Sequence, residues 1–168
     1  FVIQAGLLMQ PIIEMAKKCP ARIVYAEGEN DDVLMAVQAV VDEAIAHPVL
    51  IGRKCHIEDK IDRLGLRIDL DSDVVIVDPN NYKKYVEYTD YYHSLMGRNG
   101  VSVAASQQIM RHDNTAVAAV MVAIGDADGL ICGKVGRFDF HLREIMQLLG
   151  PDDKHQLMSS AALLLMPD

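Results

Sequence analysis

The chain has 168 residues, of which 51% are hydrophobic and 24% are charged, a balance that predicts one soluble globular domain with a sizeable core. Its formal net charge of -8 argues against nucleic-acid or anionic-membrane partners, because these require a concentrated positive surface. The three cysteines are an odd number without a C-x-x-C pair, which is typical of a reducing compartment. No H-x-x-x-H pair occurs, so no metal site is predicted.

Neither a membrane segment nor a secretion signal is recognisable. The apolar run of residues 161–166 is far shorter than the roughly 20 residues that span a bilayer, and no basic stretch precedes an apolar start. We therefore expect a cytoplasmic protein. The chain starts at Phe1 without a methionine and stops just after an apolar run, so we also expect it to be a fragment of a longer chain.

The predicted elements alternate between helices and strands. Pro11 suits the first turn of a short helix that runs to about Lys18, because its missing N–H is not needed there. Short apolar runs, β-branched in part, predict strands at residues 22–26, 48–52, 73–78, 129–132 and 160–166. Helical spacing of apolar residues predicts a helix from Asp31 onward, and others over residues 57–64, 81–100, 102–110, 113–124 and 138–149.

This alternation predicts an α/β fold with three layers, in which a mainly parallel sheet has helices on both faces. No repeat and no low-complexity linker divides the chain, so a single domain is expected. The helix after Pro79 carries tyrosines at helical spacing. Such a stripe favours a core or subunit contact over a platform for stacking bases.

One strand end has the chemistry of an anion site. Ligands of open α/β sheets bind beyond the carboxyl ends of the strands, and the stretch GDADGLICGKVGRFDFHLREI, residues 125–145, lies at one such end. Gly133 and Gly136 allow close approach of the backbone, Lys134 and Arg137 add charge, and a helix N-terminus follows. The alternative is a tight turn with solvated cations. The glycine spacing matches neither a P-loop nor a dinucleotide-binding motif.

Three other sets of side chains are weaker candidates. Glu27 and Glu29, at the end of the first strand, are suited to binding a cation or acting as a base, with helix capping as the alternative. Asp139 with His141 would suit acid–base chemistry, although an Asp near a helix start is more commonly a cap or a dipole partner. Cys132, at the end of a buried strand, is interpreted as an inert core thiol.

Four segments in order resemble a known family: YAEGENDDVLMAVQ, HPVLIGR, YYHSLMGRNGV and ADGLICGKVGRFDFHLREIMQ. They look like the first half of a phosphotransacetylase (phosphate acetyl/butyryl transferase) domain. Ordinary transferases carry S-G-A-x-H-S-T-A-D-T-x-R-P where this chain has C-G-K-V-G-R-F-D-F-H-L-R-E, which retains Gly133 and Arg143. The C-G-x-V-G-R form, with L-M-G-R upstream, is similar to the domain that follows the catalytic part of large bacterial NADP-dependent malic enzymes.

The resemblance implies that residues 1–168 are the N-terminal part of such a domain, with acetyl-CoA as an effector bound in a cleft. The implied acetyl-CoA and phosphate contacts are Gly133, Lys134, Gly136, Arg137, Arg143 and Arg98, the last lying two residues beyond Met96, where transferases often have an arginine. No catalytic residue and no cofactor are implied for this fragment. NADP and a divalent metal would bind to the catalytic domain of the parent enzyme.

The resemblance also implies a homo-oligomer, at least a dimer, with a regulatory rather than a catalytic role. Two alternatives are an active phosphate acetyltransferase, which makes acetyl phosphate and CoA from acetyl-CoA and phosphate, and a purely structural dimerisation module.

Overall fold

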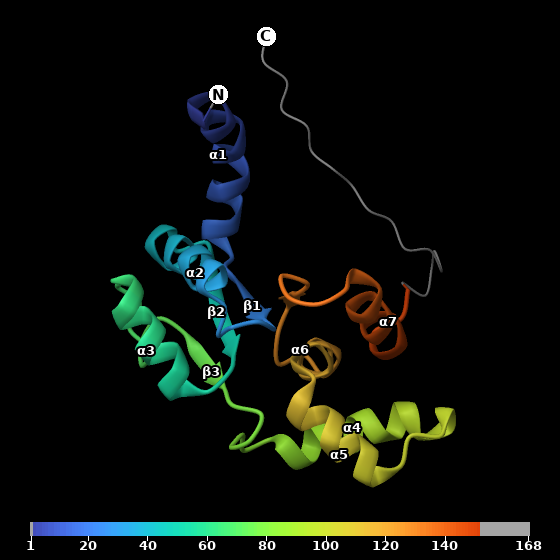
Figure 1. Ribbon diagram of the computed structural model, residues 1–168. Helices are drawn as coiled ribbons and strands as arrows, with labels where there is room; N and C mark the ends of the chain where they lie inside the picture. The colour runs from blue at the N-terminus through green and yellow to red at the C-terminus, as the bar shows by residue number, and fades with distance from the viewer. Residues whose placement is uncertain (1, 152–168) are drawn as a thin grey trace.

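The computed structural model describes residues 2–151 and contains a four-stranded sheet between two groups of helices (Figure 1). The strand order is β3-β2-β1-β4, and every neighbouring pair is parallel. The strands are β1 (Ala21–Tyr25), β2 (Ala46–Ile51), β3 (Val75–Val77) and β4 (Gly129–Ile131). The predicted α/β class is confirmed.

The two central strands are buried on both faces, which explains their nearly continuous apolar sequences. In the register of the sheet, Val24 lies opposite Val49 and Tyr25 lies opposite Leu50. Because successive side chains of a strand point to opposite faces, the first pair packs into one hydrophobic cluster and the second pair into another.

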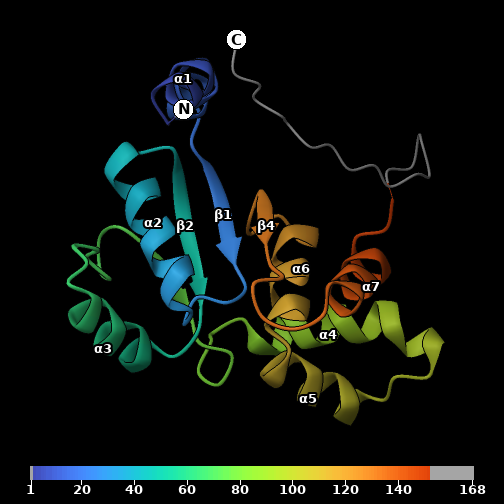
Figure 2. The same cartoon turned by 45° about the horizontal axis from the view of Figure 1, so that its top comes forward.

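Helices cover both faces of the sheet, as Figure 2 shows from a second direction. Tyr25 and Leu50 pack with α2 (Asp31–Glu43) and α3 (Lys54–Leu64). The opposite face carries Val24 and Val49 and packs with the later helices, which are α4 (Tyr85–Met96), α5 (Val103–His112), α6 (Asn114–Ala123) and α7 (Phe138–Leu148). A short 3-10 helix, η1 (Gly97–Asn99), follows α4.

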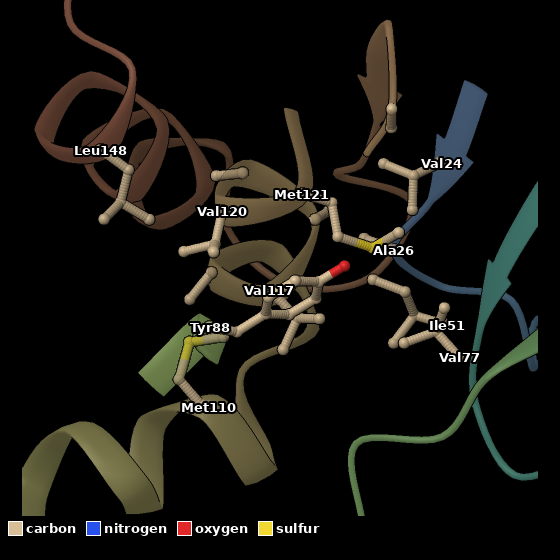
Figure 3. Close-up of a cluster of buried hydrophobic side chains, with 14 of the residues drawn as sticks. Val24, Ala26, Ile51, Val77, Tyr88, Met110, Val117, Val120, Met121 and Leu148 are labelled. Atoms are coloured by element: carbon tan, nitrogen blue, oxygen red, sulfur yellow. The ribbon is translucent and has the colours of Figure 1, made fainter. Parts of the chain in front are cut away.

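The core of the second face is built around α6 (Figure 3). Residues 115–121 of this helix are all buried, and Figure 3 shows Val117, Val120 and Met121 among side chains from the strands and from α4, α5 and α7. Tyr88 and Tyr92 are each 1% exposed in this cluster. Tyr88 and Tyr92 of the tyrosine stripe therefore belong to the core, which is one of the two roles predicted for the stripe.

Side chains begin three of the helices where their sequences predict. Asn30 accepts hydrogen bonds from the Asp32 and Val33 amides at the start of α2. Ser102 and Asp113 do the same for the first turns of α5 and α6. These contacts satisfy N–H groups that have no partner inside a helix. They also place Asn30 and Asn114 at the carboxyl edge of the sheet, where the strands end.

Two of the boundaries that differ from the sequence prediction have a local physical cause. The first helix, α1 (Val2–Lys18), starts well before Pro11 and contains it, whereas Pro11 was expected in the first turn. The preceding residues have helix-forming sequence, and this outweighs the single N–H bond that proline removes. β3 is shorter than the predicted strand because residues 70–73 form a turn closed by Asp69 and Asp73. The predicted strand at 160–166 lies outside the described residues.

Within residues 2–151, no helix combines the length and the apolar character needed to cross a bilayer.

Candidate functional site

All four strands end at the same edge of the sheet, and the loops that leave them surround a cleft. Two hollows of about 450 and 330 Å³ share Glu29, Arg53 and Asn114. We call them together the strand-end cleft. Its other lining residues are Glu27, Asn30, Gly52, Lys60, Pro79, Asn80, Arg111, His112 and Val135.

An ion pair between Glu29 and Arg53 forms the floor shared by the two hollows. The Arg53 guanidinium donates to both Glu29 carboxylate oxygens at 3.0 Å, and the Arg53 backbone N–H donates to Oε1 at 2.9 Å. Hydrogen bonds from Arg53 lower the pKa of Glu29 to about 2, against a smaller opposing effect of burial. Glu29 is therefore ionised at neutral pH and fixed in place.

Cationic groups gather around this cleft although the chain as a whole is acidic. Lys60 donates to the Glu29 carbonyl at 2.5 Å and to Asp31 at 2.8 Å. On the opposite wall, Arg111 donates to the Tyr85 hydroxyl at 3.0 Å and lies over the Tyr85 ring. Arg53 completes the set. Arg53 and Lys60 are already paired with Glu29 and Asp31, so Arg111 is the lining cation that makes no ion pair with an acid within the described residues.

The loop from Gly133 to Arg137 borders the cleft through Val135. Gly133 and Gly136 have φ angles of 96° and 98°, a left-handed conformation that glycine adopts without a side-chain clash. In this conformation the Gly133 and Val135 N–H groups both donate to Glu27 Oε1, at 2.8 and 3.5 Å. Successive amides that converge in this way form a binding site for an oxyanion, and here the oxyanion is a carboxylate of the same chain.

Both cations of this loop are paired with acids. Lys134 Nζ lies 2.5 Å from Asp32 Oδ2, at the start of α2. Arg137 makes two bonds of 2.9 Å to the Asp139 carboxylate. The side chains of Arg137 and Asp139 are 73% and 61% exposed, so solvent screens this pair and it contributes little to stability.

Arg143 and Arg98, the other two predicted contacts, lie outside the loop. The Arg143 guanidinium lies 4.9 Å from the centre of the Phe140 ring, and that of Arg137 lies 5.6 Å from the same centre. These two arginines therefore share one aromatic neighbour. Arg98 belongs to η1, is exposed, and does not line the strand-end cleft.

The weaker candidates from the sequence have separate partners. Asp139 bonds to Arg137, whereas His141 lies between the Thr115 hydroxyl and the Val135 carbonyl, each at 2.8 Å. Since a carbonyl only accepts, the His141 Nε2 must carry a proton, and the ring holds the loop in place. No Asp139–His141 acid–base pair is formed within the described residues.

Glu27 and Glu29 bind different groups, and Asn30 rather than either glutamate caps α2. Across residues 2–151, no group of three or more His, Cys, Asp or Glu side chains is placed to hold a metal ion. Burial, with a smaller contribution from Glu27, raises the pKa of the Cys132 thiol, which disfavours the reactive thiolate.

Sequence reasoning missed several cleft residues: Lys60, Arg111, His112 and Asn114. Arg53 had a usable signal, because it follows the second predicted strand directly. Lys60, Arg111 and Asn114 come from helices, and their approach to the strand ends depends on packing that no short motif reveals.

A family model described as phosphate acetyl/butaryl transferase matches residues 7–168. The chain therefore belongs to the phosphate acetyl/butaryl transferase family. Among curated relatives, it is 42% identical to an NAD-dependent malic enzyme of Rhizobium meliloti (strain 1021) over 89% of this chain and 20% of the relative. It is 36% identical to an NADP-dependent malic enzyme of Haemophilus influenzae over 99% of this chain and 22% of the relative.

The chain thus spans about a fifth of the length of these relatives. Among solved structures, EutD phosphotransacetylase from Staphylococcus aureus superposes with a TM-score of 0.73 at 18% identity, over 86% of this chain and 44% of that chain. At this identity the likeness concerns the fold. The fold of this chain therefore corresponds to less than half of that phosphotransacetylase chain.

Proposed function

We propose that this chain is part of an acetyl-CoA-sensing regulatory domain of a cytoplasmic malic enzyme. A catalytic domain outside this chain would decarboxylate malate oxidatively to pyruvate, with NADP and a divalent metal bound there. The similarity to malic enzymes, of which the chain spans about a fifth, supports this assignment. The names of the relatives include both NAD and NADP.

The convergence of the Gly133 and Val135 amides on one oxyanion is the observation that carries the proposed ligand. Acetyl-CoA is a polyanion, because its CoA part contains a pyrophosphate and a further phosphate. Lys134 and Arg137 flank the amides, and Arg53 and Lys60 line the adjoining 450 Å³ hollow. Amide donors close to several cations suit a phosphate group better than a neutral ligand.

The surroundings of Cys132, the candidate nucleophile, and of His141, the candidate base, favour sensing over acetyl transfer. The pKa of the Cys132 thiol is raised, and both ring nitrogens of His141 have hydrogen-bond partners. In the described residues, neither group is positioned to activate a nucleophile. The alternative activity, acetyl transfer to phosphate, would require residues beyond those described.

The test is a titration of the purified protein with acetyl-CoA, in which calorimetry and the melting temperature report binding. Arg137→Ala is expected to weaken binding about tenfold through loss of one charge-assisted contact. Arg67→Ala is the matched control, because Arg67 is 78% exposed and also pairs with a single aspartate, Asp42. Equal affinities of wild type and Arg137→Ala would remove Arg137 from the site, and no binding by any of the proteins would refute the sensing role.

Two further measurements concern the longer protein. If the domain regulates malate turnover, acetyl-CoA should change the rate of malate-dependent NADPH formation, while Arg137→Ala should leave the rate without acetyl-CoA unchanged. Formation of acetyl phosphate from acetyl-CoA and phosphate would instead favour the transferase alternative.

We also propose that the protein is a homo-oligomer, at least a dimer. The expected contribution of the tyrosine helix is reduced, because Tyr88 and Tyr92 are buried in the core. Exposed apolar side chains instead gather in and around the loop that leads into α7, where Phe138 is 76% exposed and Val135 is 58% exposed. Sedimentation of wild type and Phe138→Ser tests this. A monomeric wild type at high concentration would contradict it.

A further inference from the structure

The Gly133 and Val135 amides and the side chains of Lys134 and Arg137 in this loop each already hold a carboxylate of the same chain. The backbone amides hold Glu27, Lys134 holds Asp32, and Arg137 holds Asp139. The loop therefore has the donors and charges of an anion receptor, but acids of the protein satisfy them. An external anion would have to replace at least one of these carboxylates.

Glu27 is the carboxylate best placed to be replaced. Its side chain is partly exposed and lines the 450 Å³ hollow of the strand-end cleft, together with Val135. Of its two hydrogen bonds, the one from Gly133 is short at 2.8 Å, whereas the one from Val135 is at the 3.5 Å limit. A side chain held mainly by one amide, next to open space, can leave without disturbing the core.

The backbone beside Glu27 cannot shift in the same way. The neighbouring Gly28 is packed so closely against β2 that a Cβ atom there would lie 2.8 Å from the Ile51 carbonyl oxygen. Exchange at the amides therefore takes place by rotation of the Glu27 side chain toward the cleft. His141 holds the opposite side of the loop in place, because its ring bonds to both Thr115 and Val135.

We propose that Glu27 is a built-in competitor that occupies the amide site until the phosphate of a ligand displaces it. Binding then requires a state in which Glu27 has left, and the apparent affinity is reduced by the fraction of molecules in that state. Shortening or removing Glu27 should strengthen anion binding. This is the reverse of the usual result for a residue that lines a binding site.

This inference deepens the proposed function and rests on it for the identity of the ligand. The experiment therefore uses inorganic phosphate, so that it can succeed or fail independently of acetyl-CoA. Phosphate is titrated at constant ionic strength into wild type, Glu27→Ala and Glu27→Asp, with thermal stability as the first readout. Hydrogen exchange of the peptide that covers residues 130–137 is the second, because it locates the bound phosphate.

We expect the apparent Kd for phosphate to fall at least tenfold in Glu27→Ala, with new protection confined to that peptide. Glu27→Asp keeps the charge but lacks one methylene group, so it loses contact with the amides and should also bind more tightly than wild type. Glu58→Ala, which removes an equal charge from α3, should match wild type and so exclude a general effect of net charge.

Three results would overturn the proposal. Wild type and Glu27→Ala would bind phosphate equally, or the protection would fall outside residues 130–137. Alternatively, Glu27→Ala would be destabilised and phosphate would not restore its stability, which would make the carboxylate a structural tie. Tighter phosphate binding without any binding of acetyl-CoA would support the competitor role and refute the proposed function.

Discussion

The Tyr88 hydroxyl donates a 2.6 Å hydrogen bond to the Asp126 carboxylate, which joins α4 to the turn before β4. Lys84 donates to both oxygens of the same carboxylate at 2.7 Å. Burial, together with the nearby Asp126, raises the pKa of Tyr88, so the hydroxyl stays neutral and remains a donor. This contact ties together segments 38 residues apart on the helical side of β4.

Tyr88→Phe should therefore lower the free energy of unfolding by about 1.5–3 kcal/mol, the range for a hydrogen bond to a charged group. Urea unfolding at neutral pH measures this. The matched control is Tyr91→Phe on the same helix, because the Tyr91 hydroxyl makes no hydrogen bond within the described part of the chain. Similar losses for the two variants would show that the hydroxyl contact is not the cause.

The surroundings of Glu144 on α7 disfavour the ionised form of its carboxyl group. Its Oε2 atom is buried without a hydrogen-bond partner in the described structure, and burial, followed by the charge of Asp113, raises its pKa. Between the ordinary value of 4.5 and the raised value, the folded protein binds more protons than the unfolded chain. The stability contribution of this group is therefore present at low pH and is lost as pH rises through that window.

Glu144→Gln should raise the melting temperature at pH 7, by roughly 2–4 °C. The gain should disappear near pH 4, where wild-type Glu144 is protonated in both states. Calorimetric melting of wild type and variant across this range provides the measurement. A gain that is the same at both pH values would assign the effect to packing instead of ionisation.

Glu29 gives the opposite pH dependence. Its folded pKa of about 2 lies below the ordinary 4.5, so its stabilising contribution is present above 4.5 and is lost as pH falls toward 2. Glu29→Gln is expected to cost about 1 kcal/mol at pH 7, because the partner Arg53 is half exposed and solvent screens the pair. The difference from wild type should shrink in urea unfolding at pH 3. A constant difference would contradict the ion-pair explanation.

A pair of glycine substitutions separates backbone strain from crowding. Gly136 and Gly125 have φ angles of 98° and 82°, so Gly→Ala costs about 1–2 kcal/mol at either position. A Cβ atom at 136 would also lie 3.1 Å from His141 Nε2, whereas one at 125 meets nothing within 4 Å. Gly136→Ala should therefore be the more destabilising, and His141→Ala in the same protein should narrow the gap. Equal losses of stability in the two Gly→Ala variants, measured by thermal unfolding, would show that the His141 ring moves away from the added Cβ atom at no cost.

The sequence predicted the layers of the fold better than the contacts of the loop. β-branched runs identified the strands, and Asp31, Ser102 and Asp113 marked helix starts, because helix-start and strand patterns are local. Pro11 misled the prediction, because a helix tolerates the loss of one N–H bond when the residues before it also favour a helix.

The partners of the loop could not be read from spacing. Gly133 is 106 residues from Glu27, and they meet because β1 and β4 are neighbours in the sheet. The same holds for Glu29 and Arg53, which lie 24 residues apart at the ends of β1 and β2. Strand order decides which acids reach which donors, and nothing in a short motif encodes strand order.

The position of β1 at the centre of the sheet has a consequence for how the protein forms. While the chain is being synthesised, β1 can pair with β2 after a few tens of residues, and β3 follows soon after. The other neighbour of β1 is β4, which is synthesised much later. Arg22 in β1 bonds to Asp128, just before β4, and the two residues are 106 positions apart. Pairings of such long separation close slowly. We therefore expect the half with α2 and α3 to assemble first, and the loop that holds Glu27 to be among the last parts of the chain to reach its native arrangement.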